Sequence, residues 1–366
     1  MGFKTGIVGL PNVGKSTLFN ALTRTSSAQT ANFPFCTIDP NVGEVPVPDS
    51  RLEELSKIAS SKMIIPTKMT FVDIAGLVKG ASKGEGLGNK FLANIRECDA
   101  IIHVLRCFQD SEVTHVSGKV DPIADAEIIE TELLLADLET TEKKVISFKK
   151  KASSGDKDSK KALILLERLV KLLGGGFPAR TLELEEEDIS TFNALHLLTA
   201  KPILYVCNVP ESSAASGNEF SLKVQELAKT RNANMVIISA VIEEEISKLE
   251  DPQDASLFLE DLGLEEPGLK RIITTGYKLL NLQTFFTVGP KETRAWTISK
   301  GSFAPQAAGK IHTDFERGFI RAEIISYDDY ITYQGEQGAK EAGKMKIEGK
   351  SYLIQEGDVV HVLFNL

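Results

Sequence analysis

Several features that would point to particular classes of protein are scarce or missing in this sequence. Its 366 residues include four cysteines, Cys36, Cys98, Cys107 and Cys207, with no C-x-x-C spacing among them. Scattered cysteines argue against a disulfide framework or a zinc site, so we expect reduced thiols. No apolar run is long enough to cross a bilayer, and this excludes an ordinary membrane-spanning helix.

An excess of positive charge is also missing. The formal net charge is -9, which argues against nonspecific binding of DNA or RNA by the whole surface but allows local basic patches. The first residues lack the long apolar segment of a signal peptide, and Gly2 precedes a segment poor in Ser and Thr. We therefore expect a soluble, cytoplasmic protein without a membrane partner, long enough for two or three structural units.

A phosphate-binding motif is present near the start of the chain. Residues 9–17 read G-L-P-N-V-G-K-S-T, a G-x-x-x-x-G-K-S loop between a strand-like run and an amphipathic segment. This context predicts a P-loop, in which backbone N–H groups and the helix N-terminus hold phosphates. Lys15 would reach the β- and γ-oxygens, and Ser16 would ligate Mg²⁺. The nucleotide-binding residues expected here are Asn12, Val13, Gly14, Lys15, Ser16 and Thr17.

A second motif, D-I-A-G at residues 73–76, follows the strand-like run 68–73. Asp73 would hold Mg²⁺ through water, and the Gly76 amide would meet the γ-phosphate. Between the two motifs, Thr37 is either a further metal ligand on a switch loop or an ordinary turn threonine. The P-loop and D-I-A-G together predict a magnesium-nucleotide site.

Three further strand-like runs, residues 100–105, 202–207 and 235–239, complete the pattern of an α/β protein with a doubly wound, mostly parallel sheet. The second of them leads into N-V-P-E, where a guanine-reading loop would have N-K-x-D. Val209 carries no charge, and Glu211 is one methylene longer than the Asp that pairs with guanine donors, so guanine specificity should be lost. The residues alone leave open whether this loop prefers adenine or reads no base.

These motifs resemble those of a known family. The P-loop, D-I-A-G-L-V-K-G-A-S-K-G-E-G-L-G-N and F-P-F-C-T-I resemble the Obg branch of translation-related GTPases, and N-V-P-E narrows the resemblance to the YchF, or Obg-like ATPase, family over essentially the whole chain. The resemblance implies an ATPase switch that binds ATP and ADP and associates with the ribosome, the large subunit above all, through RNA and protein surfaces. It also implies a base site formed by Asn208, Val209, Glu211, Ser239 and Ala240.

The residue after D-I-A-G is Leu77, at a position where many GTPases keep a Gln that orients the attacking water. Because leucine cannot do so, we expect slow turnover and another way of placing water. His115 is either that catalytic group or a structural histidine; a partner, or a cation such as K⁺ beside Asn12, is the alternative. We expect His103, inside an apolar strand, to be a hydrogen-bonded core residue.

Residues 123–200 are predicted to form an inserted antiparallel helical hairpin with coiled-coil packing. Its expected apolar seam is Ile128, Leu135, Leu138, Val145, Phe148, Leu163, Leu166, Val170 and Leu173. Around the turn, residues 141–161 carry eight lysines against three acidic residues. A patch that faces RNA and a solvated helix tip are equally compatible with this composition.

The last part of the chain, residues 281–366, changes to short β-like runs with Gly and Pro turns. It resembles a TGS domain, a ubiquitin-like β-grasp module, in which His312 and Asp314 would have structural or partner-binding roles. The predicted organisation is therefore a nucleotide-binding domain over 1–280 with the insert, followed by this module. An ATPase switch, an adaptor that ATP locks into shape with negligible turnover, and a ribosome-assembly GTPase remain open.

Overall fold

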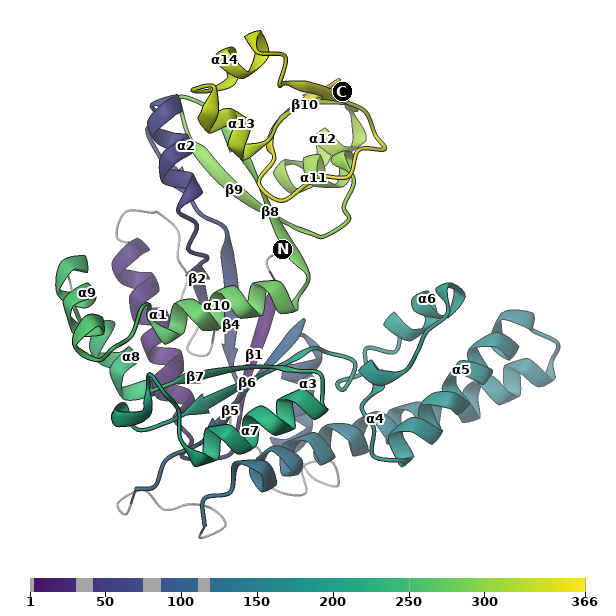
Figure 1. Cartoon of the computed structure of the whole chain (residues 1–366). Helices are drawn as coiled ribbons and strands as arrows, with labels where there is room; N and C mark the ends of the chain where they lie inside the picture. Colours follow the sequence, from purple (N-terminus) through teal and green to yellow (C-terminus); the bar gives the residue numbers. More distant parts are fainter. Residues whose placement is uncertain (1–2, 31–41, 75–86, 111–118, 250, 366) are drawn as a thin grey trace. The chain divides into compact units, whose positions relative to one another are not determined.

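The computed structural model describes residues 3–30, 42–74, 87–110, 119–249 and 251–365 (Figure 1). The chain forms two compact units, one made of residues 1–45 and 70–272 and the other of residues 46–69 and 273–366. No helix in the described parts of the chain is both long enough and apolar enough to span a bilayer.

The first unit is built on a six-stranded sheet in the order β2-β4-β1-β5-β6-β7. Each pairing from β4 through β1, β5 and β6 to β7 is parallel. Every residue of β5 and of β6 is buried, as expected for central strands covered by helices on both faces. The strands are β1 Lys4–Val8, β2 Val42–Pro46, β4 Lys68–Asp73, β5 Ala100–Arg106, β6 Ile203–Asn208 and β7 Asn234–Ile238.

Helices alternate with these strands along the chain, which confirms the predicted doubly wound α/β class. They are α1 Lys15–Thr30, α3 Leu87–Arg96, α7 Glu219–Thr230, α8 Ala240–Ile246, α9 Pro252–Asp261 and α10 Gly268–Leu279. Because the sheet is parallel, the ends of β1, β5, β6 and β7 open at one edge, and the loops that follow them form the site described below.

The insert contains a hairpin of α4 (Pro122–Ser153) and α5 (Lys157–Gly174), followed by the short α6 (Ile189–Asn193). Gly155, with φ +95°, lies in the turn between α4 and α5. The hairpin core contains Leu166 and Leu173 of the expected seam, and Leu138, Val145 and Phe148 pack against it. The expectation for Leu135 is wrong: its side chain is 43% exposed, and its neighbour Leu134 packs on the core instead.

The second unit has a six-stranded sheet in the order β11-β10-β12-β8-β9-β3. β8 and β9 form an antiparallel hairpin, and the last strand, β12, pairs parallel with β8. Together with the helix that follows the hairpin, this is the β-grasp arrangement predicted for the C-terminal region. The strands are β3 Ile64–Ile65, β8 Leu282–Val288, β9 Thr293–Ser299, β10 Phe319–Ile325, β11 Lys346–Glu348 and β12 Val359–Phe364, and the helices are α2 Arg51–Ala59, α11 Ala304–Ile311, α12 Thr313–Arg317, α13 Tyr327–Thr332 and α14 Glu336–Glu341.

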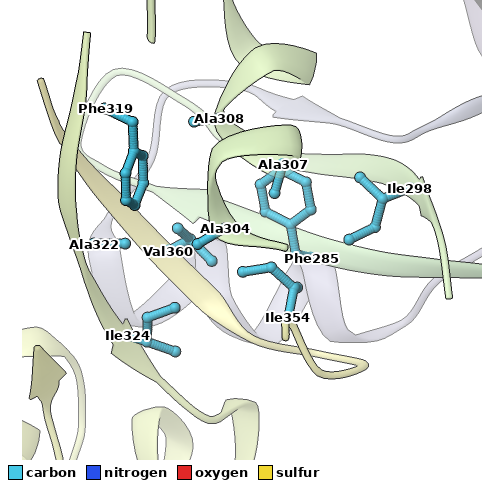
Figure 2. Packing of buried hydrophobic residues seen from close by; sticks show 10 residues of the cluster. All are labelled: Phe285, Ile298, Ala304, Ala307, Ala308, Phe319, Ala322, Ile324, Ile354 and Val360. Carbon is cyan, nitrogen blue, oxygen red and sulfur yellow. The ribbon is translucent and has the colours of Figure 1, made fainter. Parts of the chain in front are cut away.

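Both faces of this second sheet are covered. Figure 2 shows the core on the face of α11, where Phe285, Ile298 and Val360 of the sheet meet the alanines of the helix. On the other face, Leu52 and Leu55 of α2 pack with Phe286 and Ala295. The expected boundary at residue 281 therefore misses residues 46–69, which belong to the second unit because their apolar side chains complete its core.

Candidate nucleotide-binding site

The P-loop connects β1 to α1 and depends on two glycines. Gly14 has φ +96°, and a Cβ atom there would lie 2.3 Å from Nδ2 of Asn208. A Cβ atom on Gly9 would lie 2.6 Å from the carbonyl oxygen of Val104 on β5. Both positions therefore require glycine, because a side chain would collide with the neighbouring strands or their loops.

Lys15 and Asp73 occupy the same corner beneath the loop. Lys15 is 8% exposed, and its Nζ donates a hydrogen bond to the carbonyl oxygen of Leu10 at 2.7 Å. Burial lowers the pKa of Lys15 and raises the pKa of Asp73, and each charge partly opposes the shift of the other. Ser16 is exposed in the first turn of α1.

Asp73 also presents an unused acceptor. Its Oδ1 atom is buried and has no hydrogen-bond partner in the described part of the chain. A buried acceptor without a partner calls for an explanation, and a hydrated Mg²⁺ held by oxygen ligands supplies one. The carboxylate of Asp73, the hydroxyl of Ser16 and the cationic Lys15 therefore fit a magnesium-nucleotide complex.

Asn208, at the end of β6, connects the P-loop to the start of α8. Its Nδ2 donates to the carbonyl oxygen of Val13 at 3.0 Å, and its Oδ1 accepts from the amide of Ala240 at 2.9 Å. The next residue, Val209, donates its amide to the carbonyl oxygen of Ile238 at 2.8 Å. Asn208 is 5% exposed, so its side chain holds together the loops at the ends of β1, β6 and β7.

A pocket of about 490 Å³ opens beside Asn208 at this edge of the sheet. Four of the residues expected at the base line it, namely Asn208, Val209, Glu211 and Ser239. The Oγ atom of Ser239 is buried without a hydrogen-bond partner in the described residues. The remaining lining residues are Phe108, Gln109, Asp110, Pro210, Ser212 and Val241.

The segment 108–110 was missing from the sequence-based prediction of the site. Arg106, at the end of β5, is 1% exposed; its Nε donates to the carbonyl oxygen of Phe108 at 3.2 Å, and its guanidinium lies 4.6 Å from the centre of the Phe108 ring. Asn218 donates to the carbonyl oxygen of Cys107 at 2.7 Å. Phe108, two residues after the buried strand β5, could have been predicted as a site residue. The ends of β5, β1 and β6 lie at the same edge of the sheet, so an aromatic residue there is placed beside the pocket.

Several predicted residues lie outside the described parts of the chain: Thr37, Gly76, Leu77 and His115. Their roles stay predictions. His103 is fully buried, as expected, but neither of its ring nitrogens has a hydrogen-bond partner among the described residues. Burial lowers the pKa of His103 to about 3, so the ring is neutral.

His312 and Asp314 have a local structural role in the second unit. Nδ1 of His312 accepts a hydrogen bond from the amide of Asp314 at 3.2 Å, which caps the N-terminus of α12. This is the structural one of the two roles, structural or partner-binding, that we expected for His312, and neither residue is among those that line the pocket.

Comparisons with known proteins agree over the whole chain. Residues 4–168 match the family model described as 50S ribosome-binding GTPase, and residues 282–365 match the model for the C-terminal domain of YchF GTPases, described as a protein of unknown function. The chain is 56% identical to the ribosome-binding ATPase YchF of Escherichia coli O157:H7 and 54% identical to that of Bacillus subtilis, with 100% of each chain covered. A solved structure of the Schizosaccharomyces pombe YchF GTPase superposes with a TM-score of 0.90 at 39% identity, covering 99% of this chain and 98% of that one.

Proposed function

This chain belongs to the YchF family, and we propose that it is a ribosome-binding ATPase of the cytoplasm that hydrolyses ATP slowly and uses the ATP and ADP states as a switch. The observation that carries the proposal is the pocket of about 490 Å³, because the residues of N-V-P-E line it and Asn208 connects it to the P-loop. The full-length identity to relatives named ribosome-binding ATPases supports the partner.

At the phosphate end, Lys15 neutralises the β- and γ-oxygens, and the amides of the P-loop hold them in place. Ser16, Asp73 and Thr37 are the side chains that would hold Mg²⁺, with Asp73 acting through water. Mg²⁺ held by these side chains would supply positive charge that stabilises the charge developing on the phosphate. The buried, unpartnered Oδ1 of Asp73 supports its part in this set.

At the base end, the site lacks the features that select guanine. Val209 is 2% exposed and apolar, so this position offers the base no cationic side chain. Glu211 lines the pocket with a carboxylate one methylene beyond the length that pairs with the two guanine donors. An apolar wall at Val209 and Phe108 suits a purine ring, and adenine leaves fewer donors unpaired than guanine does.

Slow turnover follows from Leu77, which cannot orient a water molecule. His115 is our candidate for the group that does so, and K⁺ beside Asn12 is the alternative. Either group would act only after the P-loop has bound the nucleotide. A variant that removes it should therefore lower the rate of hydrolysis and leave ATP affinity unchanged.

The helical hairpin supplies a surface for ribosomal RNA, but ion pairs neutralise part of the positive charge of its lysines. Lys143, Lys149 and Lys161 pair with Glu139, Glu167 and Glu187, acidic residues outside the lysine-rich segment. Lys151 lies over the ring of Phe148, 5.6 Å from its centre. Within the described chain, the four other lysines, Lys144, Lys150, Lys157 and Lys160, make no ion pair with an acidic side chain. These four lysines are the better candidates for binding phosphates.

A GTPase is the second candidate, because the family model and the solved yeast relative both carry that word in their names. An adaptor with negligible turnover is the third. Release of phosphate from ATP and from GTP by the purified chain separates these activities.

The ribosome part of the proposal is tested by co-sedimentation. We expect more protein to pellet with ribosomes in the presence of a non-hydrolysable ATP analogue than with ADP, since a switch needs states that differ in affinity. Protein that stays in the supernatant in every nucleotide state at low salt would remove the ribosome from the proposal while leaving the ATP site intact.

A further inference from the structure

The pocket for the base is formed by three loops, each of which is held by a polar side chain behind it. Arg106 holds segment 108–110 after β5, through its bonds to the carbonyl oxygens of Phe108 and Asp110. Asn208 holds the loop after β6 against the P-loop. After β7, Ser239 leads directly into α8, and Ser239 together with Val241 of α8 lines the pocket.

α8 is only seven residues long. A helix of this length is not stable by itself, so its position depends on tertiary contacts. At its N-terminal end, Ala240 donates to Asn208. One turn further along, Glu243 is 2% exposed and points away from solvent, whereas its neighbour Glu244 pairs with Lys248 at the surface.

The carboxylate of Glu243 is bound to the N-terminus of α10. Oε1 accepts from the amide of Gly268 at 2.7 Å, and Oε2 accepts from the amide of Leu269 at 3.0 Å. These are the first two residues of α10, whose N–H groups have no partner within the helix. The carboxylate satisfies both donors and lies at the positive end of the helix dipole.

The packing around this carboxylate leaves no spare room. A Cβ atom on Gly268 would lie 2.7 Å from Oε1 of Glu243 and 2.6 Å from Cγ2 of Ile238, the last residue of β7. Arg271, one turn into α10, donates to the carbonyl oxygen of Ile237 at 2.9 Å. α10 is thus held against both the end of β7 and α8, the two elements on either side of Ser239.

We propose that Glu243 is a positioning residue for the nucleotide base: by binding the N-terminus of α10 it fixes α8, and so places Ser239 and Val241 at the pocket. This rests on the proposed ATP-binding function of the same site. Glu243 is not among the residues that line the pocket, and its two carboxylate oxygens accept from Gly268 and Leu269 of α10. We therefore expect its effect to be largest at the base end.

The test compares Glu243→Gln with Glu244→Gln, a matched change on the same helix. Glutamine keeps the size of Glu243 but can accept only one of the two amides and brings an N–H₂ group toward the other. We expect the dissociation constant for ATP to rise roughly tenfold in Glu243→Gln and to stay unchanged in Glu244→Gln. At saturating ATP, the single-turnover rate should stay within about twofold of the wild type, because the phosphate end is untouched.

Gly268→Ala gives a second variant that disturbs the same hydrogen bonds from the side of α10, with the same expected result. A purely structural role would change the single-turnover rate and the dissociation constant together, or lower the melting temperature without any change in ATP affinity; either result overturns the proposal. If neither variant folds, Glu243 serves stability and the positioning role is also wrong. Failure of the wild-type chain to bind ATP would instead contradict the proposed function.

Discussion

The phosphate end and the base end of the nucleotide site use different kinds of structure. At the phosphate end, a short stretch of chain, Gly9 to Ser16, supplies nearly all the groups, and two glycines set its path. At the base end, segments that follow β5, β6 and β7 each supply a few residues, and buried polar side chains hold them together. The first arrangement is local in sequence and the second depends on the whole sheet.

This difference implies that substitutions at the phosphate end change the rate of the chemical step. Substitutions at the base end instead change how the loops around the base are positioned. A group that touches the transferring phosphate contributes directly to the transition state. A group such as Asn208 contributes by keeping loops in register, so its removal should appear first as lower stability or weaker binding.

The largest effect should come from the phosphate end. Lys15→Ala or Ser16→Ala removes a group that binds phosphate or metal, and we expect the single-turnover ATPase rate to fall by on the order of 10²-fold or more. Leu77→Ala should stay within about tenfold of the wild type, because the leucine orients no water. A Leu77 variant as slow as the Lys15 variant, with ATP affinity intact, would contradict this account of the missing glutamine.

Asn208→Ala should be the most damaging single change at the base end. It leaves the carbonyl oxygen of Val13 and the amide of Ala240 without their partner, which should lower the stability of the first unit by about 2–4 kcal/mol. The measurement is the thermal unfolding of the chain, with Asn20→Ala, an exposed position on α1, as the control. Equal melting temperatures for the two variants would mean that the two hydrogen bonds of Asn208 contribute little to stability.

The pH dependence of nucleotide binding tests the phosphate end, where both shifted groups lie. Burial raises the pKa of Asp73 and lowers that of Lys15. On acidification the metal-free Asp73 therefore becomes neutral earlier than an ordinary aspartate and would offer Mg²⁺ one negative charge less, while at alkaline pH Lys15 loses its charge earlier than an ordinary lysine. We expect affinity for magnesium-ATP to fall at acidic and at alkaline pH, and the acidic fall to become smaller in Asp73→Asn, where only protonation of the ATP phosphates remains. An unchanged acidic fall in that variant would assign it to another group.

The smallest effect concerns the hairpin. Changing Lys150, Lys157 and Lys160 to Ala should weaken ribosome binding and reduce its salt dependence by about one unit of log-log slope for each RNA phosphate that is no longer neutralised. The matched control changes Lys143, Lys149 and Lys161, which are paired with glutamates and should matter less. Equal effects of the two triple variants on co-sedimentation would show that the ion pairs do not select which lysines face the RNA.

The same contrast explains how much could be predicted from the sequence. The P-loop was predictable because its pattern lies in one short segment, and Asp73 stood out because D-I-A-G directly follows a strand-like run. The residues at N-V-P-E were found by their place after a strand. Phe108 was missed although it closely follows a buried parallel strand, which was a usable signal. Glu243 was missed because its hydrogen bonds join α8 to α10, a pairing that no local pattern records.

The domain boundary was missed for the same reason. Residues 46–69 read as part of the nucleotide-binding domain, yet β3 pairs with β9 and α2 completes the core of the second unit. Removal of residues 281–366 would therefore leave the apolar side chains of Leu52 and Leu55 without cover. Variants at the surface of the full chain are the sounder test of what the second unit binds.

The most direct test of the central claim is a comparison of the dissociation constants for ATP and GTP, measured by titration of the purified full-length chain in Mg²⁺. With Val209 and Glu211 in place of the residues that read guanine, the account predicts tighter binding of ATP than of GTP. Glu211→Asp, which restores the shorter carboxylate, should move the ratio toward GTP. Binding of GTP as tight as or tighter than that of ATP by the wild-type chain would contradict the account.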